Sequence, residues 1–216
     1  MKHIYCISGF GADKRVFSKI NFEGNEVHFI QWINPLKNET IESYASRMTE
    51  QIHYANPILL GLSFGGMMCI EIAKIIATGK VIIISSIKTF HEMPTWMTLT
   101  GRMKLDKIFP LKTFRFIEPI ENYNLGIENP DELKLVHEYR KNIGQQYTNW
   151  ATHQIVNWQN EWIPANLFHI HGGKDHIFPI KNIKPDYIIA DGGHFMIMNR
   201  SEKVNAIIEE ILKLYR

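Results

Sequence analysis

Short apolar runs recur in both end regions of the chain, separated by stretches in which apolar residues return every three or four positions. Each run is bounded by glycine, proline or polar residues, a pattern typical of buried strands. The predicted strands cover residues 3–7, 27–32, 58–60, 81–85, 167–171 and 187–190. Branched residues dominate several of them, as expected for strands buried in a parallel sheet.

Helical patterns fill the gaps between these strands. The predicted helices cover residues 14–20, 41–54, 67–77 and 201–214. Asp13 is the predicted N-cap of the first helix and Ser201 that of the last, whereas Gly79 is the predicted stop of the third. Strands that alternate with helices at this spacing predict βαβ units and a parallel sheet.

The alternation breaks off in the middle of the chain, where helical patterns follow one another and no convincing strand appears. These helical patterns cover residues 94–105, 131–143 and 148–158. The sequence therefore predicts a core made of residues 1–87 and 165–216, with a helical insertion at 88–164. The insertion is interpreted as a cap over an active site, and a packing appendage is the alternative.

The strand at 58–60 runs directly into Gly61-Leu62-Ser63-Phe64-Gly65, which is followed by a helical pattern. Gly-x-Ser-x-Gly between a strand and a helix is typical of a sharp turn that exposes a serine hydroxyl above a sheet. Glycines are needed there because strand and helix pass closely around a strained residue. A tight turn with a solvated serine is the alternative interpretation.

A serine hydroxyl needs a base and a group that orients this base. Asp175 follows the strand at 167–171 on a glycine-rich loop, and His194 follows the strand at 187–190 on another. Because the carboxyl ends of parallel strands meet in one crevice, both side chains are expected near Ser63. Asp191 is interpreted as a turn residue and Asp186 as part of a solvated loop.

Four matches in the same order carry a family resemblance: Ser8-Gly9-Phe10-Gly11, Gly61-Leu62-Ser63-Phe64-Gly65, His171-Gly172-Gly173-Lys174-Asp175 and Gly192-Gly193-His194. With them the chain resembles the α/β-hydrolase superfamily along nearly its whole length. The resemblance implies that Ser63 is the nucleophile, His194 the general base and then acid, and Asp175 the orienting group. It also implies an oxyanion hole made by the backbone N–H groups of Phe10 and Phe64.

The chain departs from the family pattern in two places. Ser8-Gly9 stands where family members often have His-Gly, and that histidine usually supports the loop. The chain also begins at what would be the third strand of the family. We therefore expect the α/β-hydrolase fold in a minimal form, with about six mostly parallel strands and the cap inserted after the fourth strand.

Length and charge narrow the functional classes. The 216 residues suffice for one domain with an inserted subdomain, and 24 basic against 22 acidic residues favour no nucleic-acid partner. Cys6 and Cys69 are expected to be small buried residues in a reducing compartment. The start of the chain is too polar for a signal peptide, and no run is long enough to span a membrane. A cytoplasmic location is expected.

Histidines crowd the C-terminal loops, so a metal site must be considered. His171 and His176 flank a glycine loop rather than one face of a helix, and no cysteine joins them. No metal and no other cofactor is therefore predicted. His3, His28 and His169 lie within strand patterns and are interpreted as structural.

The predicted cap is rich in Met and Trp, which are usually core residues but together would form an apolar roof. Met93, Trp96, Trp150 and Trp158 are the candidate substrate-binding residues. A basic segment also lies in the cap, with Arg102, Lys104, Lys107, Lys112 and Arg115 against Asp106. It is either a solvated face or a docking site for an acyl carrier or a CoA-like anionic group.

The expected function is hydrolysis of a small ester or thioester by a cofactor-free serine hydrolase, through an acyl-enzyme. A non-catalytic small-molecule receptor or interaction protein on the same fold is the rival from another class. A lyase that uses the same histidine as a base is the third hypothesis, disfavoured because no lysine directly follows His194.

Overall fold

One parallel sheet forms the centre of the protein. The computed structural model describes residues 1–103 and 118–214. Within these residues, six strands lie in the order β2-β1-β3-β4-β5-β6, and every neighbouring pair is parallel. Their bounds are β1 (His3–Ile7), β2 (Glu26–Ile30), β3 (Ile58–Leu62), β4 (Lys80–Ile84), β5 (Leu167–Gly172) and β6 (Tyr187–Ile189). The predicted parallel architecture is confirmed.

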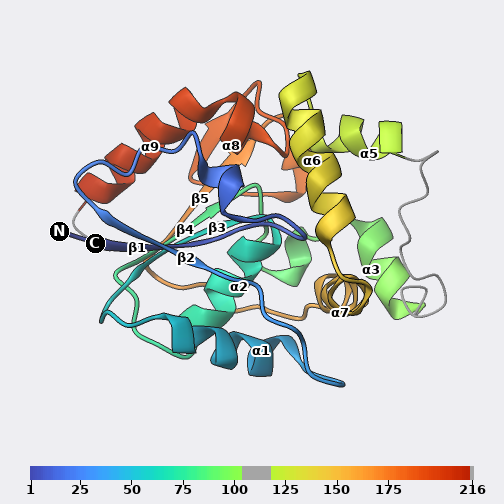
Figure 1. The fold of residues 1–216 in the computed structure, drawn as a ribbon, viewed down its shortest axis with the longest axis horizontal. Helices are drawn as coiled ribbons and strands as arrows, with labels where there is room; N and C mark the ends of the chain where they lie inside the picture. The colour runs from blue at the N-terminus through green and yellow to red at the C-terminus, as the bar shows by residue number, and fades with distance from the viewer. Residues whose placement is uncertain (104–117, 215–216) are drawn as a thin grey trace.

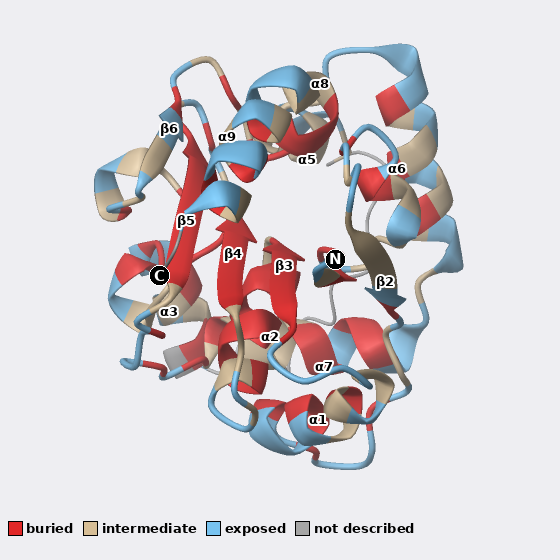
Figure 2. Cartoon of the chain, turned by 90° about the vertical axis from the view of Figure 1, so that its left-hand side faces the viewer, coloured by how far each residue is buried: buried red, intermediate tan, exposed pale blue. Residues whose placement is uncertain are grey.

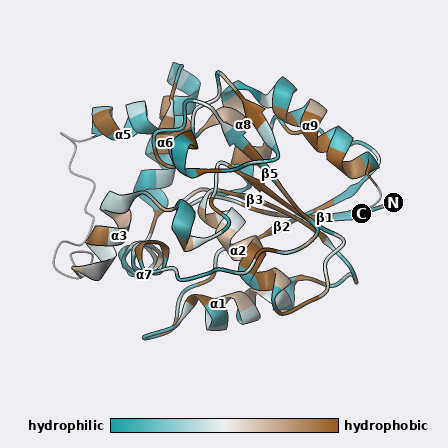
Figure 3. Ribbon diagram, turned by 180° about the vertical axis from the view of Figure 1, so that it is seen from behind, coloured by the Kyte–Doolittle hydropathy of each residue, from teal (hydrophilic) through white to brown (hydrophobic). Residues whose placement is uncertain are grey.

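Successive residues of each strand point to opposite faces of the sheet and so belong to two separate cores. Tyr5 and Leu59 belong to one hydrophobic cluster, and their neighbours Ile4 and Leu60 belong to the other. Strands β3, β4 and β5 are buried along their length (Figure 2). Hydrophobic residues accordingly gather in the sheet, between helices whose outer faces are hydrophilic (Figure 3).

Helices cover both faces. One core includes residues of α1 (Ile41–Met48) and α2 (Phe64–Ala73), and the other includes residues of α8 (Met196–Asn199) and α9 (Ser201–Lys213). Short 3₁₀ helices are η1 (Lys14–Phe17), η2 (Thr49–Gln51), η3 (Phe90–Glu92) and η4 (Ile180–Asn182). Among the described residues, every helix is too short or too polar to traverse a lipid bilayer.

In the described residues, four α-helices lie between β4 and β5 in the chain. They are α3 (Thr95–Arg102), α5 (Glu118–Leu125), α6 (Pro130–Asn142) and α7 (Gln145–Val156). Figure 1 shows them at the end of the molecule opposite the two chain termini, where the strands have their carboxyl ends. The helical character of the insertion agrees with the sequence analysis, and its division from the core at residues 88 and 164 stays a prediction.

Several predicted helix bounds differ from those observed. Helix α2 begins at Phe64, directly after Ser63, rather than at residue 67. Ser201 was wrongly predicted as a cap: it is the first helical residue of α9, and Arg200 occupies the cap position without a side-chain cap bond. Asp13, by contrast, caps η1 by accepting a hydrogen bond from the N–H of Arg15.

Two α-helices of the described residues, α5 and α8, were not predicted. Helix α5 has a weakly periodic, largely polar sequence with a proline in its first turn, so its helical pattern is faint. Helix α8 has four residues and is buried through Met196, Ile197 and Met198, so its pattern merges with the turn before it. Helix α8 therefore depends on tertiary packing that local periodicity does not report.

The order of the strands determines where a ligand site can form. The chain goes from β1 outward to β2 and then returns to the other side of β1 as β3. This reversal falls between β1 and β3, and open parallel sheets bind ligands at the carboxyl ends of the strands on either side of such a reversal. The loop after β1 carries Phe10, and the turn after β3 carries Ser63.

Candidate active site

Ser63 occupies a strained backbone position between β3 and α2, with φ 53° and ψ −120°. The turn is so tight that a Cβ on Gly61 would lie 2.3 Å from the carbonyl oxygen of Gly65. A Cβ on Gly65 would lie 2.2 Å from the carbonyl oxygen of Ile7 on β1. The two glycines are thus needed for close backbone packing, and the strain at Ser63 is held by its surroundings.

Backbone hydrogen bonds fix the strained turn to the neighbouring strand. The Ser63 N–H donates to the carbonyl oxygen of Ile84, the last residue of β4, over 2.9 Å. The Ser63 carbonyl accepts from the Ser86 hydroxyl at 2.7 Å and from the Gly66 N–H at 2.8 Å. Sequence analysis missed Ser86, whose one signal is its place just after a buried strand.

Ser63, His194 and Asp175 form one chain of hydrogen bonds. The Ser63 Oγ lies 3.0 Å from His194 Nε2, and His194 Nδ1 lies 2.8 Å from Asp175 Oδ2. Because an ionised carboxylate only accepts, Nδ1 carries the proton and Nε2 of the neutral ring faces the hydroxyl as an acceptor. The structure thus brings the three residues of the predicted triad into the order that a general base requires.

Asp175 is almost completely buried, with 3% of its surface exposed. Its Oδ1 accepts from the N–H groups of Ile177 and Phe178, each over 2.9 Å. Burial alone would raise the pKa of Asp175, but the charge interaction and hydrogen bond with His194 outweigh burial and lower it below its ordinary value. Asp175 is therefore held as a carboxylate in a fixed orientation.

Two further histidines are buried behind Asp175. His171 Nε2 lies 2.8 Å from the carbonyl oxygen of Phe178, which can only accept, so Nε2 carries a proton. Nδ1 of neutral His171 lies 3.2 Å from His169 Nε2 and accepts from it. Burial is the main cause that lowers the pKa of His171, and it lowers the pKa of His169 well below its ordinary value. Both rings are neutral packing and hydrogen-bonding groups.

The loop after β1 passes directly beside the serine turn. A Cβ on Gly9 would lie 3.4 Å from the Cβ of Ser63. The Ser8 hydroxyl donates to the Ala12 carbonyl at 2.7 Å and accepts from the Trp32 indole N–H at 3.0 Å. Ser8 thus fastens this loop internally.

The backbone N–H groups of Phe10 and Phe64, the two predicted oxyanion donors, have no hydrogen-bond partner among residues 1–103 and 118–214. For Phe64 the reason is general, because the first N–H groups of a helix have no acceptor within it. The Phe64 ring is buried and stacks on Trp32, with 5.2 Å between the centroids and 3° between the planes. Phe10 is partly exposed and contacts Tyr147.

The four candidate substrate-binding residues lie in different environments. They are Met93, Trp96, Trp150 and Trp158. Trp150 is buried beside the serine turn, edge-on to Phe64 at 6.1 Å between centroids. Trp158 donates its indole N–H to Glu71 at 2.8 Å, further along α2, and Trp96 is largely exposed. Among these four residues, and within the described part of the chain, Trp150 makes a ring contact with the serine turn, through Phe64.

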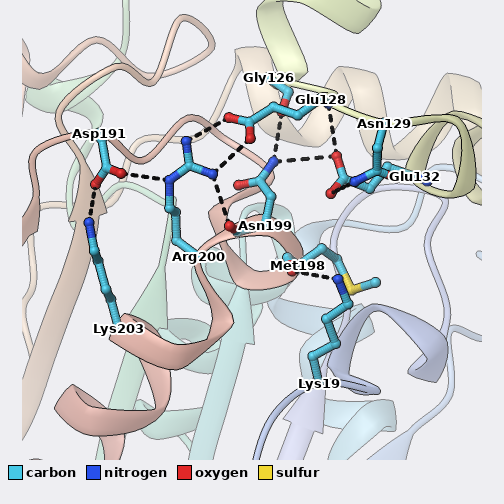
Figure 4. A network of polar contacts seen from close by, with 10 residues as sticks. All are labelled: Lys19, Gly126, Glu128, Asn129, Glu132, Asp191, Met198, Asn199, Arg200 and Lys203. Carbon is cyan, nitrogen blue, oxygen red and sulfur yellow. Dashed lines mark hydrogen bonds and ion pairs between the residues drawn. The ribbon is translucent and has the colours of Figure 1, made fainter.

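Asp191 is far more exposed than Asp175 and forms ion pairs with two basic side chains on the surface. Its carboxylate accepts from Arg200 Nε at 2.8 Å and from Lys203 Nζ at 2.6 Å (Figure 4). These contacts, with that to Lys203 the strongest, lower the pKa of Asp191 to about 2. The structure joins Asp191 to α9 and to Arg200, whereas Asp175 faces His194.

His176, on the loop after β5, contributes no contact to this site in the described structure. His176 is exposed, and its ring stacks on Tyr123 of α5. Of the basic segment, Arg102 ends α3, whereas Lys104, Lys107, Lys112 and Arg115 lie outside the described residues.

Comparisons with known proteins identify the fold. No family model matches the chain, and no curated protein matches its sequence. Solved structures do match: an esterase from Exiguobacterium antarcticum has a TM-score of 0.75 at 15% identity, covering 99% of this chain and 92% of that one. An esterase from Thermogutta terrifontis has a TM-score of 0.74 at 15% identity, covering 99% and 90% of the two chains. MenH from S. aureus has a TM-score of 0.73 at 18% identity, covering 98% and 93%. The chain has the α/β-hydrolase fold, as its sequence predicted.

Proposed function

We propose that this protein is a serine hydrolase that cleaves a small carboxylic ester or thioester through an acyl-enzyme. The observation that carries the proposal is the unbroken hydrogen-bond chain from Asp175 through His194 to Ser63. An α/β-hydrolase fold alone would not fix the reaction, because one fold supports many functions. The chemistry is inferred from this site.

In the proposed reaction Ser63 Oγ attacks the substrate carbonyl carbon while its proton moves to His194 Nε2. The tetrahedral intermediate then breaks its bond to the alcohol or thiol, which leaves with the proton from His194. Water attacks the acyl-enzyme in the same way, with His194 as base, and the carboxylic acid is released. Asp175 holds the ring in the required tautomer and stabilises the imidazolium.

The negative charge that develops on the carbonyl oxygen requires donors that are already oriented. The N–H groups of Phe10 and Phe64 are proposed for this role. Phe64 directly follows Ser63, Phe10 directly follows Gly9, whose Cβ would lie 3.4 Å from the Cβ of Ser63, and neither N–H group is used by other described residues. Such a donor contributes about 3–4 kcal/mol to transition-state stabilisation in acyl transfer. The short α2 N-terminus adds a favourable backbone dipole.

The acyl group is proposed to lie against the aromatic side chains around Phe64. Tyr147 contacts both Trp32 and Trp150 there, with ring centroids 5.5 Å and 6.1 Å away. Phe10 and Tyr147 extend this surface on the side of the loop after β1. Aromatic rings of this kind favour an acyl chain or an aromatic acid over a charged one.

Reaction with a fluorophosphonate tests the nucleophile. One adduct per chain is expected by intact mass, located on Ser63 by peptide mapping, and Ser63→Ala should lose both labelling and turnover of p-nitrophenyl esters. Ser18→Ala, which changes an exposed serine, is the matched control and should behave as wild type. Labelling that persists in Ser63→Ala would refute the assignment of the nucleophile.

The same experiment separates the rival functions. A chain that binds p-nitrophenyl esters without turnover and without labelling would be a receptor on this fold rather than an enzyme. The lyase hypothesis predicts turnover without an acyl-enzyme, and a trapped acyl adduct on Ser63 would exclude it. Graded ester chain lengths then measure how much acyl group the aromatic surface accepts.

An acyl carrier or a CoA-like group is retained as a proposal for the leaving side of the substrate. It rests on the basic sequence around residues 102–115, most of which lies outside the described residues. Exposed charges act within a Debye length, which is about 10 Å at 0.1 M salt and about 3 Å at 1 M. A carrier substrate should therefore show a salt-dependent KM, whereas a neutral p-nitrophenyl ester should not.

A further inference from the structure

We propose that His3, Glu26 and His28 form a binding site for one divalent transition-metal ion, with Zn²⁺ as the ion whose preferences they match. Ligand-capable atoms of all three residues lie within 4.8 Å of one another. The site lies at the amino ends of β1 and β2, whereas Ser63 follows the carboxyl end of β3. It is therefore separate from the proposed catalytic centre and does not depend on the proposed function.

Strand pairing brings these three residues together. His3 is the register partner of Glu26, and Tyr5 is the partner of His28. Because alternate residues of a strand share one face, Glu26 and His28 lie on the same face of β2, beside His3 on β1. A signal for this site exists in the sequence as Glu26-Val27-His28, but its third member is distant in the chain.

The distances resemble those around a tetrahedral ion. His3 Nδ1 lies 3.2 Å from His28 Nε2 and 3.5 Å from a Glu26 oxygen, and His28 Nε2 lies 3.9 Å from the other oxygen. Ligands bound at 2.0–2.2 Å around tetrahedral zinc lie about 3.3 Å apart. Small side-chain adjustments would place all three atoms on one ion.

Hydrogen bonding accounts for this arrangement less completely than an ion does. When one of the nitrogens His3 Nδ1 and His28 Nε2 carries a proton, it donates to the other, and one donor and one acceptor are satisfied. That proton then points away from the carboxylate of Glu26. A cation accepts a lone pair from each of the three residues at once. Two imidazoles and one carboxylate suit zinc and its neighbours among transition metals, whereas Mg²⁺ and Ca²⁺ prefer oxygen ligands alone.

Aromatic neighbours already hold both rings in place. The His3 ring stacks on Tyr54 with 3.5 Å between centroids and 9° between planes, and the His28 ring stacks on Tyr5 at 4.5 Å and 19°. The two imidazoles are 23% and 25% exposed, so an ion can enter from solvent and keep a water ligand. Stacking on these rings limits how far the two imidazoles can turn.

The bound ion would fasten β2, the edge strand of the sheet, to β1. Beside the five-residue ladder between these strands, it would add a cross-link at the end where both strands begin. A ligand that binds only the folded state raises its stability by mass action. The expected consequence is a melting temperature that rises with the concentration of free Zn²⁺.

Titration of the metal-free full chain with ZnCl₂ at pH 7.5, by calorimetry and thermal unfolding, tests the site. One ion per chain is expected for the wild type. His28→Gln and Glu26→Gln should each weaken binding by about tenfold or more and reduce the Zn²⁺-dependent rise in melting temperature. Co²⁺ should give the strong visible absorption of a four-coordinate site in the wild type and not in His28→Gln.

His91→Gln is the matched control, because His91 is an exposed histidine 3.5 Å from Glu161. It should bind Zn²⁺ as the wild type does, and its thermal response should be unchanged. His28→Gln and Glu26→Gln should both melt cooperatively without metal, which separates a loss of binding from a loss of folding. Equal Zn²⁺ isotherms for wild type and His28→Gln would overturn the proposal, and the three residues would then form only a hydrogen-bonded surface cluster.

Discussion

The loops after β5 and β6 have similar sequences but place their aspartates in opposite environments. His171-Gly172-Gly173-Lys174-Asp175 follows β5, and Asp191-Gly192-Gly193-His194 follows β6. Each loop has a Gly-Gly pair, and each has one aspartate. Asp175 is buried against His194, whereas the carboxylate of Asp191 lies at the surface between Arg200 and Lys203.

The glycine pairs explain how the two loops lie so close together. A Cβ on Gly172 would be 2.4 Å from the carbonyl oxygen of Gly192, and one on Gly173 would be 2.6 Å from that of Ala190. The loop after β5 therefore needs both of its glycines for the close approach of the loop after β6. The aspartate after the pair, Asp175, faces His194, whereas the one before it, Asp191, stays at the strand end and faces Arg200 and α9. Position relative to the pair, rather than residue type, separates the two environments.

Exchange of each aspartate for asparagine should give the largest contrast. Asp175→Asn keeps the shape of the side chain but allows the wrong histidine tautomer, so kcat should fall by about 10⁴-fold. Asp191→Asn should change kcat by no more than about twofold, because exposed surface substitutions have small effects. Initial rates on a p-nitrophenyl ester measure both.

Circular dichroism and unfolding midpoints must show that both variants are folded at the assay temperature. A loss of rate in Asp191→Asn that equals the loss in Asp175→Asn would contradict the proposed triad. The acid would then be shared between the loops or misassigned.

Acid should destabilise the region behind Asp175 before it affects Asp191. His169 and His171 have lowered pKa values in the folded protein, whereas an unfolded chain binds their protons near the ordinary value of 6.5. As the pH falls below 6.5 the unfolded state takes up protons that the folded state does not. Their stabilising contribution is thus complete above 6.5 and is lost as the pH falls through the folded pKa values. The free energy of unfolding should decrease by at most about 1.4 kcal/mol per pH unit for each histidine.

Urea unfolding at pH 7.5 and pH 5.5 measures this loss. Between these two pH values, the free energy of unfolding of His169→Gln should decrease less than that of the wild type. The exposed control His91→Gln should lose as much as the wild type does. The carboxylates act later: the lowered pKa values of Asp175 and Asp191 withdraw their contribution only as the pH falls below about 4. A wild-type protein equally stable at both pH values would exclude neutral buried histidines.

The sequence predicted the strands, the serine turn and the order of Ser63, Asp175 and His194, because these depend on local patterns. Apolar runs and glycine turns report burial and backbone geometry directly. The contacts of Ser86 with Ser63, and of Trp32 with Ser8, join different strands and have no local signature. Such contacts follow from the strand order, which the apolar pattern does not specify.

The histidines show the same division. His169 and His171 alternate along a predicted strand, yet both are fully buried and bonded to each other, because this strand end is covered by the loop at Phe178. The roles of Ser63, Asp175 and His194 in catalysis, and of the residues of the insertion in substrate binding, remain predictions that need kinetic tests.

His171 should position Asp175 rather than take part in the chemistry. Its Nε2 lies 3.6 Å from Asp175 Oδ2 and is bonded to Phe178, whose N–H also donates to Asp175. His171→Gln should lower kcat on the order of tenfold by loosening this arrangement, with KM nearly unchanged. Steady-state kinetics at pH 7.5 distinguish the two parameters. A rise in KM alone would place His171 in binding instead.

The smallest effects on stability are expected from changes to the partners of Asp191, which accepts hydrogen bonds from both Arg200 and Lys203 at the surface (Figure 4). Lys203 is largely exposed and long, so its ion pair is screened and its ordering costs side-chain entropy. Lys203→Gln should change the melting temperature by about 2 °C or less. Arg200→Gln should lower it more, because Arg200 also donates to Glu128 through both terminal nitrogens and so joins the segment before α6 to the start of α9.

Melting curves at 0.1 M and 1 M NaCl test this ranking. High salt should narrow the difference in melting temperature between wild type and Lys203→Gln. Arg200→Gln should stay less stable than wild type at both salt concentrations, because the bidentate contacts that it removes are only partly screened. If Lys203→Gln were the more destabilising change, the exposed pair would be stabilising the loop that carries His194, and the two aspartates would differ less than their burial indicates.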